Sequence, residues 1–339
     1  DAMEPAFCEG ARALIVGGGY IGLEAAAVAC KRGMSVTIIE MADRILQRVA
    51  APETSDYFRA LHVGRGVEIR EATGLDRLLG EDHVTAAILA DGTELQVDVV
   101  IVGIGISPAT ELAEAAGLEL DNGIRVDEFG RTSDPSIWAA GDCASFPYKG
   151  ERIRLESVPN AIDQAEIVAD NMMGAEKTYV AKPWFWSDQY DVKLQIAGLN
   201  AGYDSVVSRV SDGSASFWYF KGDTLLAVDA MNDPRGYMIG KRLIEAGERV
   251  SLPSGTVLTE ERVVCDRLFF LLEQASQCGQ GRSEVRIRGE NALIAFDGLL
   301  RVVELRLVQL SLLYPVTELL LLLTLLLLLL FLFCSYSCC

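Results

Sequence analysis

The segment from residue 11 to residue 29 constrains this chain most, because it joins a strand to a helix through three glycines at fixed spacing. Residues 11–16 form a short apolar run typical of a buried strand. Gly17, Gly19 and Gly22 follow at once, and an alanine-rich helical stretch begins at Leu23. In such a turn the first glycine permits the tight bend, the second lets a pyrophosphate approach the backbone, and the third allows close helix packing. The pattern predicts a βαβ unit whose helix start binds phosphate groups.

A second apolar run, residues 35–39, ends in Glu40, 18 residues beyond Gly22. An acid at this place accepts hydrogen bonds from the ribose hydroxyls of adenosine and repels a 2′-phosphate, so NAD is favoured over NADP. Arg44 is close enough in sequence to weaken that preference. Two plainer interpretations stay open: a glycine turn without a ligand, and Glu40 as an ordinary surface acid.

Another glycine-rich turn follows the apolar run 97–102, with Gly103 and Gly105 ahead of a helix expected over 109–116. Open α/β sheets bind ligands at the carboxyl ends of their strands, which is where this turn would lie. Tight packing of strand on helix is the alternative explanation of the two glycines.

Charge and composition exclude several classes of function. A formal net charge of -18 argues against nucleic-acid binding, which rewards clustered Lys and Arg. Eight cysteines show no Cys-x-x-Cys pair before position 334, and His62 and His83 are the only histidines, so we expect neither a metal site nor a His-based nucleophilic triad. The cysteine spacing indicates reduced thiols in a cytoplasmic protein, and the N-terminus lacks the features of a signal peptide.

The chain divides into zones of different texture. Residues 1–180 alternate β-branched runs with helical stretches, as parallel α/β folds do. Residues 184–230 alternate apolar and polar positions, which predicts an antiparallel sheet with one solvated face, closed by a helix over 236–246. From about 251 the sequence differs in character, and 319–333 is almost entirely leucine. A membrane anchor and a non-native extension both remain open for this tail, so we expect membrane contact only if the tail is genuine.

Several ordered motifs carry a resemblance to a known family. They are the glycine turn with Glu24 and Glu40, 87–102 with the turn that follows, Gly123–Asp127, 132–135, 137–142 with Gly141 and Asp142, 156–161, and the stretch 185–190, which begins Phe-Trp-Ser-Asp-Gln. Residues 12–250 thereby resemble the FAD-dependent pyridine nucleotide oxidoreductases, most of all the NADH-dependent ferredoxin and rubredoxin reductases. The resemblance implies an α/β fold: a Rossmann-like NAD domain (1–127), a second segment of a Rossmann-like FAD domain (128–180) and a small α+β C-terminal domain (181–250), followed by an unrecognised extension (251–339).

The resemblance also implies cofactors, partners and site residues. FAD and NAD would be the cofactors, with NADH and a small iron–sulfur carrier, ferredoxin or rubredoxin, as partners. Asp142 would bind the ribityl chain of the flavin, a helix starting near Val158 would face the flavin ring, and Trp186 would lie beside the flavin and nicotinamide rings. No catalytic residue is required, because hydride chemistry belongs to the cofactors. The expected cofactor-binding residues are Gly17, Gly19, Tyr20, Ile21, Gly22, Glu24, Glu40, Gly103, Gly105, Gly141, Asp142, Val158 and Trp186.

The family pattern is incomplete here. A first glycine turn, which binds the ADP part of FAD, normally precedes the NAD domain, and we expect that half to be missing from this chain. The sequence therefore predicts a flavoprotein oxidoreductase that passes electrons from NADH through FAD to a ferredoxin or rubredoxin. The alternative is a non-catalytic NAD-binding fragment or a truncated product without activity.

Overall fold

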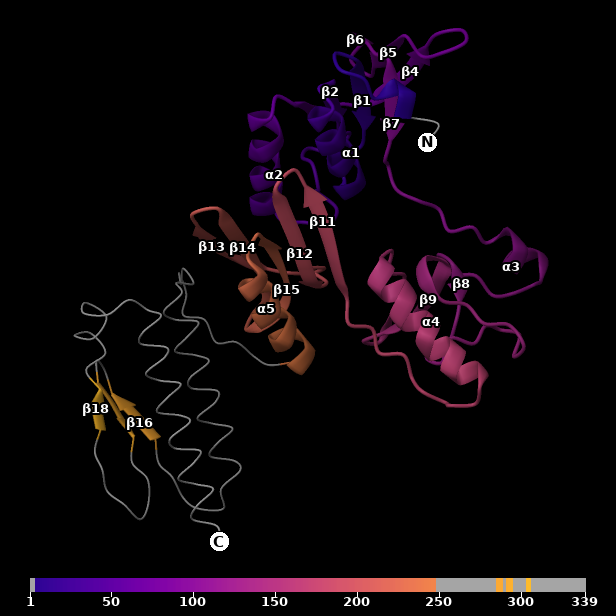
Figure 1. Cartoon of the computed structure of the whole chain (residues 1–339). Coiled ribbons are helices and arrows are strands. Elements are labelled where there is room, and N and C mark those ends of the chain that lie inside the picture. The colour runs from indigo at the N-terminus through magenta and orange to yellow at the C-terminus, as the bar shows by residue number, and fades with distance from the viewer. Residues whose placement is uncertain (1–3, 248–284, 289–290, 295–302, 306–339) are drawn as a thin grey trace. The chain divides into compact units, whose positions relative to one another are not determined.

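The computed structural model describes residues 4–247 and three short strands beyond them, at 285–288, 291–294 and 303–305 (Figure 1). The chain divides into two compact units, Asp1–Thr259 and Glu260–Cys339. In the second unit β16 (Val285–Arg288), β17 (Asn291–Ile294) and β18 (Val303–Leu305) pair antiparallel in that order. The leucine-rich tail and both of its interpretations lie outside the described residues. In the described part of the chain, no helix is long and apolar enough to cross a membrane.

The first unit opens with a short 3-10 turn (Glu4–Ala6) and a parallel sheet ordered β3-β2-β1-β7. Its strands are β1 (Arg12–Val16), β2 (Ser35–Ile39), β3 (Glu68–Arg70) and β7 (Val99–Val102). Side chains of β1 alternate between two cores: Ala13 and Ile15 belong to one, and Leu14 to the other. A strand buried on both faces explains the unbroken apolar run in the sequence. The Rossmann-like α/β expectation is confirmed.

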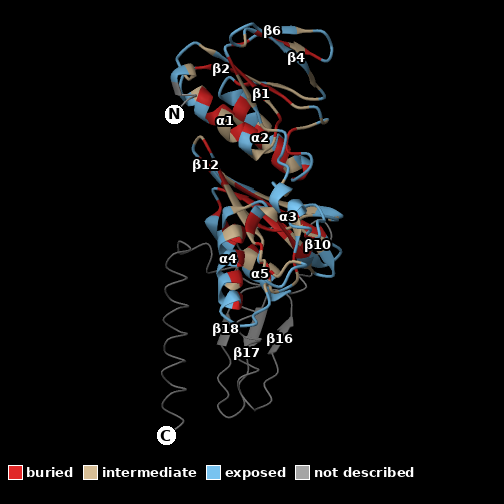
Figure 2. Cartoon of the chain, turned by 90° about the vertical axis from the view of Figure 1, so that its right-hand side faces the viewer, coloured by how far each residue is buried: buried red, intermediate tan, exposed pale blue. Residues whose placement is uncertain are grey.

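Two helices and a small antiparallel sheet cover the parallel sheet. The helices are α1 (Tyr20–Lys31) and α2 (Pro52–Gly64), and the strands are β4 (Leu75–Leu79), β5 (Ala86–Leu89) and β6 (Glu94–Gln96). Buried and exposed positions alternate along α1, as Figure 2 shows, because one side of the helix faces the core. Helix α1 begins at Tyr20 rather than Leu23, so the last residues of the glycine motif form its first turn.

The middle of the first unit carries short elements and one long helix. They are α3 (Glu111–Ala115), β8 (Ile124–Arg125), a 3-10 turn (Gly141–Cys143), β9 (Ala144–Tyr148), β10 (Glu151–Ile153) and α4 (Val158–Met172). The hydroxyl of Ser157 accepts a hydrogen bond from the Asn160 amide at 3.3 Å, so Ser157 caps α4 and Pro159 lies in its first turn.

Residues 137–140 are a short apolar run for which the sequence predicts a buried strand, and this prediction is wrong. Trp138 forms only an isolated bridge with Arg131, and the next regular strand begins at Ala144. A strand needs a neighbour whose backbone accepts and donates along its length. Among the described residues this segment has such a partner at one position only.

The last part of the first unit is an antiparallel sheet ordered β11-β12-β15-β14-β13, with α5 (Pro234–Ala246) beside it. The strands are β11 (Trp184–Gln189), β12 (Val192–Gly198), β13 (Ser205–Ser211), β14 (Ser214–Lys221) and β15 (Thr224–Met231). This confirms the expected antiparallel sheet and the helix near 236–246. The internal domain boundaries drawn from the sequence stay a prediction.

The expectation of one solvated face is wrong for β14. Residues 215–220 of β14 are all buried. Phe217 and Tyr219 share a core with Phe58 of α2, whereas Trp218 packs close to Gly240 of α5. The sheet therefore lies between α5 and the helices of the N-terminal α/β layer, which leaves β14 no face for water.

Candidate functional site

Two of the three glycines in the first turn are required by packing. Gly17 has φ +107, and a Cβ on it would lie 2.4 Å from the carbonyl oxygen of Gly103. A Cβ on Gly22 would lie 2.0 Å from the carbonyl oxygen of Gly17. Both distances are far below van der Waals contact, so any side chain at either position would push α1 off the sheet.

Gly19 is different, because the fold itself does not require a glycine there. Its φ of -78° suits any residue, and a Cβ would meet nothing within 4 Å. Gly19 is the N-cap of α1 and supplies no side-chain cap, and the first turn contains no acid. The first N–H groups of the helix therefore face an open space that a side chain would fill, which is the arrangement that suits an anionic ligand.

Glu40 bridges the glycine turn and the loop that follows β2. Its Oε2 accepts a hydrogen bond from the Gly18 amide at 2.7 Å, and its Oε1 accepts one from the Ala42 amide at 2.8 Å. Each carboxylate oxygen retains a lone pair for another donor such as a ribose hydroxyl. Gly18 is a site residue that the sequence interpretation missed. A Cβ on it would lie 2.6 Å from Cγ2 of Ile45, and the signal in the sequence was the run of three consecutive glycines, of which Gly18 is the middle one.

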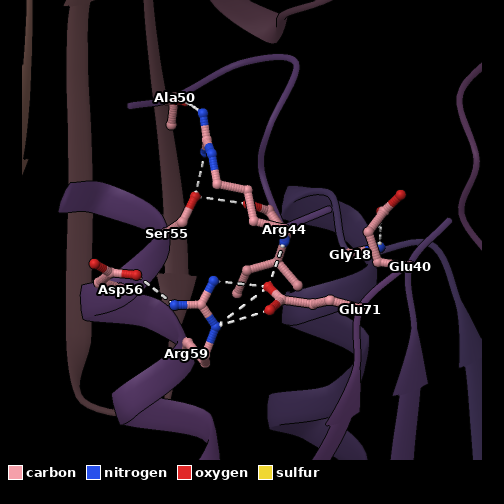
Figure 3. Close-up of polar contacts among 9 residues, drawn as sticks. Gly18, Glu40, Arg44, Ala50, Ser55, Asp56, Arg59 and Glu71 are labelled. Atoms are coloured by element: carbon pink, nitrogen blue, oxygen red, sulfur yellow. Dashed lines mark hydrogen bonds and ion pairs between the residues drawn. The ribbon is translucent and has the colours of Figure 1, made fainter. Parts of the chain in front are cut away.

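Arg44 does not extend toward Glu40. Its Nη1 donates to Ser55 Oγ at 2.5 Å and its Nη2 donates to the Ala50 carbonyl at 2.8 Å. Figure 3 shows the guanidinium turned toward these two residues and away from Glu40. Arg44 is thus engaged in holding its own loop, which removes the sequence-based reason for a weakened preference against a 2′-phosphate.

A second contact fixes the same loop from the β3 side. Glu71 accepts a hydrogen bond from the Ile45 amide at 2.8 Å. It also forms an ion pair with Arg59 at 2.8 Å, which Figure 3 shows. Side-chain contacts at three places therefore hold the loop after β2 in one conformation. A loop held in this way is preorganised for a ligand.

The glycine turns face a cleft of about 1130 Å³. The predicted residues that line it are Gly17, Gly19, Tyr20, Ile21, Glu40, Gly103 and Gly105. The amide of Gly103 donates to the carbonyl of Val16 at 2.8 Å, which holds the second turn against the end of β1. Gly105 has φ +113, and the exposed Arg48 lies near it in the cleft wall.

The other predicted residues do not line this cleft: Gly22, Glu24, Gly141, Asp142, Val158 and Trp186. Trp184 and Phe185 line it in place of Trp186, and the ring of Phe185 lies 5.1 Å from that of Tyr20. The Tyr20 hydroxyl oxygen is buried and has no hydrogen-bond partner within residues 4–247. Burial also raises the pKa of Tyr20 well above its ordinary value.

A buried acid that the sequence interpretation missed, Asp229, also lines the cleft. It is 1% exposed, and its Oδ2 accepts hydrogen bonds from the hydroxyls of Tyr219 and of Thr54, the latter at 2.7 Å. Tyr219 also accepts one from the Ala51 amide at 3.0 Å. Burial is the main cause that raises the pKa of Asp229 from 3.8 to about 6. This cluster joins β14 and β15 to the start of α2.

Gly141 and Asp142 do not line the cleft but lie next to α4, whose N-cap Ser157 does line it. The Gly141 amide donates to Gln164 Oε1 at 2.8 Å, and Gly141 has φ +80, which favours glycine. Asp142 is exposed, and its backbone carbonyl accepts from Arg154 at 2.9 Å. Val158, the first residue of α4, is 59% exposed. These residues gather an acid, a glycine turn and a capped helix start at one end of α4.

Residues of the cleft fit a dinucleotide. Gly19 leaves room for a pyrophosphate at an uncapped helix start, and Glu40 offers acceptors at the end of the neighbouring strand. The apolar walls at Tyr20, Trp184 and Phe185 suit a flat ring.

Comparison with known proteins also relates this chain to nucleotide-dependent oxidoreductases. Residues 1–165 match the family described as pyridine nucleotide-disulphide oxidoreductase, and residues 184–255 match the one described as reductase C-terminal. The chain is 45% identical over 240 residues to a putidaredoxin reductase of Pseudomonas putida, covering 69% of this chain and 57% of that protein. It is 48% identical over 242 residues to a ferredoxin–NAD(P)+ reductase of Sphingomonas, covering 69% and 58%.

Solved structures agree. The covalent putidaredoxin reductase–putidaredoxin complex matches with a TM-score of 0.71 and 42% identity over 74% of this chain and 61% of that one. The ferredoxin reductase of the CYP199A2 system from Rhodopseudomonas palustris matches with a TM-score of 0.69 and 42% identity, over 71% and 61%. The chain thus spans less than two thirds of the length of each of these relatives.

Proposed function

We propose, because the chain belongs to the pyridine nucleotide-disulphide oxidoreductase family, that it is the NADH-binding and C-terminal part of a flavoprotein reductase. The electrons of NADH would pass through FAD to a small iron–sulfur carrier, a ferredoxin or a rubredoxin. The relatives named above support this assignment by sequence and by fold.

One observation carries the nucleotide part of the proposal. Gly19 is a glycine that the fold does not need, and it lies at the uncapped start of α1 inside the cleft. The pyrophosphate would bind the amides of the first turn of α1, and the adenosine ribose would bind Glu40. The remaining length of the cleft, toward Tyr20 and Phe185, would hold the nicotinamide end.

The cofactor preferred would be NADH rather than NADPH. Glu40 is half-buried and fixed by two backbone amides, so its charge stays close to the ribose hydroxyls. A 2′-phosphate there would meet that carboxylate, and Arg44 is bound to Ser55 and Ala50 instead. Repulsion between the Glu40 carboxylate and a 2′-phosphate would disfavour the phosphorylated cofactor, NADPH.

The residues proposed for the flavin are Gly141, Asp142 and Val158, with an aromatic side chain of β11 beside the ring. When bound, FAD supplies the two-electron to one-electron conversion that links hydride transfer to an iron–sulfur protein. The protein's own contribution would be to orient the nucleotide, to exclude water with Tyr20, Trp184 and Phe185, and to present the positive end of α4 to the flavin ring.

The test has two arms, both on the purified chain. NADH and NADPH are titrated by fluorescence energy transfer from tryptophan, with Gly19→Ala as the matched variant. FAD is then added, and NADH-driven reduction of ferricyanide is followed. We expect NADH to bind more tightly than NADPH, Gly19→Ala to lose NADH, and the flavin-loaded chain to reduce ferricyanide. Absence of NADH binding at about millimolar concentration would refute the proposal, because the free energy of binding would then be weaker than about −4 kcal/mol. NADH binding without electron transfer would instead favour the non-catalytic alternative.

We also propose a cytoplasmic location. Free thiols at Cys8, Cys30 and Cys143, among the residues that the structure describes, support this proposal. Immunoblots of cytoplasmic, periplasmic and membrane fractions would test the location, and recovery in the membrane fraction would contradict it.

A further inference from the structure

One face of β11 is matched residue by residue to α1 and α2. Alternate side chains of a strand share a face, so Phe185, Ser187 and Gln189 point the same way. The ring of Phe185 contacts that of Tyr20 at 5.1 Å, and the hydroxyl of Ser187 donates to Glu24 Oε1 at 2.6 Å. Tyr20 and Glu24 are one turn apart on α1. Strand β11, which borders the cleft, is therefore bound at two places to α1, whose first turn also lines the cleft.

The polar contacts continue as one chain. The amide of Gln189 donates to Ser187 Oγ at 3.1 Å, and Gln189 Oε1 lies 2.8 Å from Nε2 of His62 on α2. Nδ1 of His62 lies 3.1 Å from the hydroxyl of Tyr190. His62, Ser187 and Gln189 are all at most 1% exposed. The chain Tyr190–His62–Gln189–Ser187–Glu24, called here the β11 relay, spans both helices and the strand.

The carboxylate of Glu24, at one end of the β11 relay, decides the direction of every hydrogen bond in it. A carboxylate only accepts, so Ser187 donates its single proton to Glu24 and must accept from the amide NH₂ of Gln189. Gln189 Oε1 then accepts from Nε2 of His62, which places the imidazole proton on Nε2. Nδ1 is left as the acceptor for Tyr190. One arrangement of protons satisfies the whole relay.

A fully satisfied buried chain with one allowed direction fixes geometry more strictly than apolar packing does. It acts on the carboxylate of Glu24, one helical turn from the ring of Tyr20 in the cleft wall. It also fixes β11 two residues after Phe185. The relay thus sets the position of both aromatic rings, those of Tyr20 and Phe185, in the wall of the cleft.

We propose that Ser187, Gln189 and His62 are positioning residues for the nicotinamide end of the dinucleotide: through Glu24 they hold β11 and α1 at the separation that shapes the Tyr20–Phe185 wall. The inference rests on the proposed function, because it presupposes that the cleft holds a dinucleotide. It assigns no role at the adenosine end, where Glu40 and Gly18 act independently of β11.

The test compares two ligands on the purified chain. NADH occupies the whole cleft, whereas ADP-ribose lacks the nicotinamide ring. Dissociation constants for both are measured by calorimetry for the parent, Ser187→Ala, Ser187→Thr and Gln189→Met. The control is Ser208→Ala. Ser208 lies in β13, and its side chain forms no hydrogen bond with any residue from 4 to 247. Melting temperatures show that each variant is folded, and Ser187→Thr keeps the hydroxyl in a residue suited to strands.

The expected result is selective. Ser187→Ala and Gln189→Met weaken NADH roughly three- to tenfold, the scale of one hydrogen bond, and leave ADP-ribose unchanged. Ser187→Thr and Ser208→Ala stay at the parent values. Equal weakening of both ligands, or of neither, overturns the inference and leaves the proposed function standing. A parent that binds neither ligand overturns both. If Gln189→Met does not fold, the Ser187 pair decides alone.

Discussion

Replacing Asp229 by asparagine removes an ionisable group from the centre of the interface between α2 and the antiparallel sheet. Asp229 is 1% exposed and accepts hydrogen bonds from Tyr219 and Thr54. These two donors favour the carboxylate, but burial outweighs them and raises the pKa from 3.8 to about 6. Ionisation is thus harder in the folded protein than in the unfolded chain.

The sign of the pH effect follows from this shift. A group whose pKa is raised on folding contributes stability that is fully present below its unfolded pKa and is lost as pH rises through its folded pKa. One pKa unit corresponds to about 1.4 kcal/mol, so the rise from 3.8 to about 6 amounts to about 3 kcal/mol. The parent should lose that amount, relative to Asp229→Asn, between about pH 4 and about pH 7.

Urea unfolding followed by tryptophan fluorescence at both pH values measures the difference, because Trp218 is buried in the same sheet. Asp229→Asn should gain about 3 kcal/mol relative to the parent as pH rises over this range. Asp223→Asn, which removes an exposed acid in the turn between β14 and β15, is the matched control. If the stability difference between Asp229→Asn and the parent is the same at both pH values, the buried carboxyl does not titrate as reasoned here.

Three further predictions concern the cleft and its support. Glu40→Gln should weaken NADH by about 1–2 kcal/mol in a fluorescence titration, because it removes a charged acceptor; unchanged affinity would exclude Glu40 from the site. Gly22→Ala should lower the free energy of unfolding by about 1–3 kcal/mol in urea, because a Cβ at position 22 meets the backbone. Gly19→Ala should change it by less than about 0.5 kcal/mol, because a Cβ there meets nothing, and equal losses for the two variants would contradict this. Burial lowers the pKa of His62, so stability should fall as pH drops below about 6.5; His62→Gln should flatten that part of the profile in thermal melts, and an unaltered slope would argue otherwise.

The glycine turns could be predicted from the sequence because their chemistry is local. Strand, turn and helix are contiguous around Gly17, and Glu40 ends the adjacent strand, so spacing alone brings these residues into one cleft. Even here the sequence did not reveal that Glu40 bonds the Gly18 amide. That contact depends on the shape of the loop after β2, which residues as distant as Glu71 hold in place.

Features that depend on a distant neighbour were not predictable. Alternation in β14 indicated a solvated face, but α2 and α5 cover both sides, and no local pattern reports a second layer. Trp184 and Trp186 are two residues apart on one face of β11, so spacing could not tell which of them reaches the cleft. Asp229 escaped notice because a single acid in a strand has no motif. Its burial arises only when β15 meets Thr54 of α2.

On the function proposed above, Glu40 performs two tasks with one carboxylate, and this limits how the cofactor preference of such a chain can change. A substitution that would welcome a phosphorylated sugar also removes the two backbone contacts at Gly18 and Ala42 that shape the loop. An engineered or evolving variant must therefore replace these two loop contacts before, or together with, the change of cofactor specificity. Single-step exchange at position 40 would weaken binding of one cofactor and remove one of the three sets of contacts that hold the loop, without creating a site for the other cofactor.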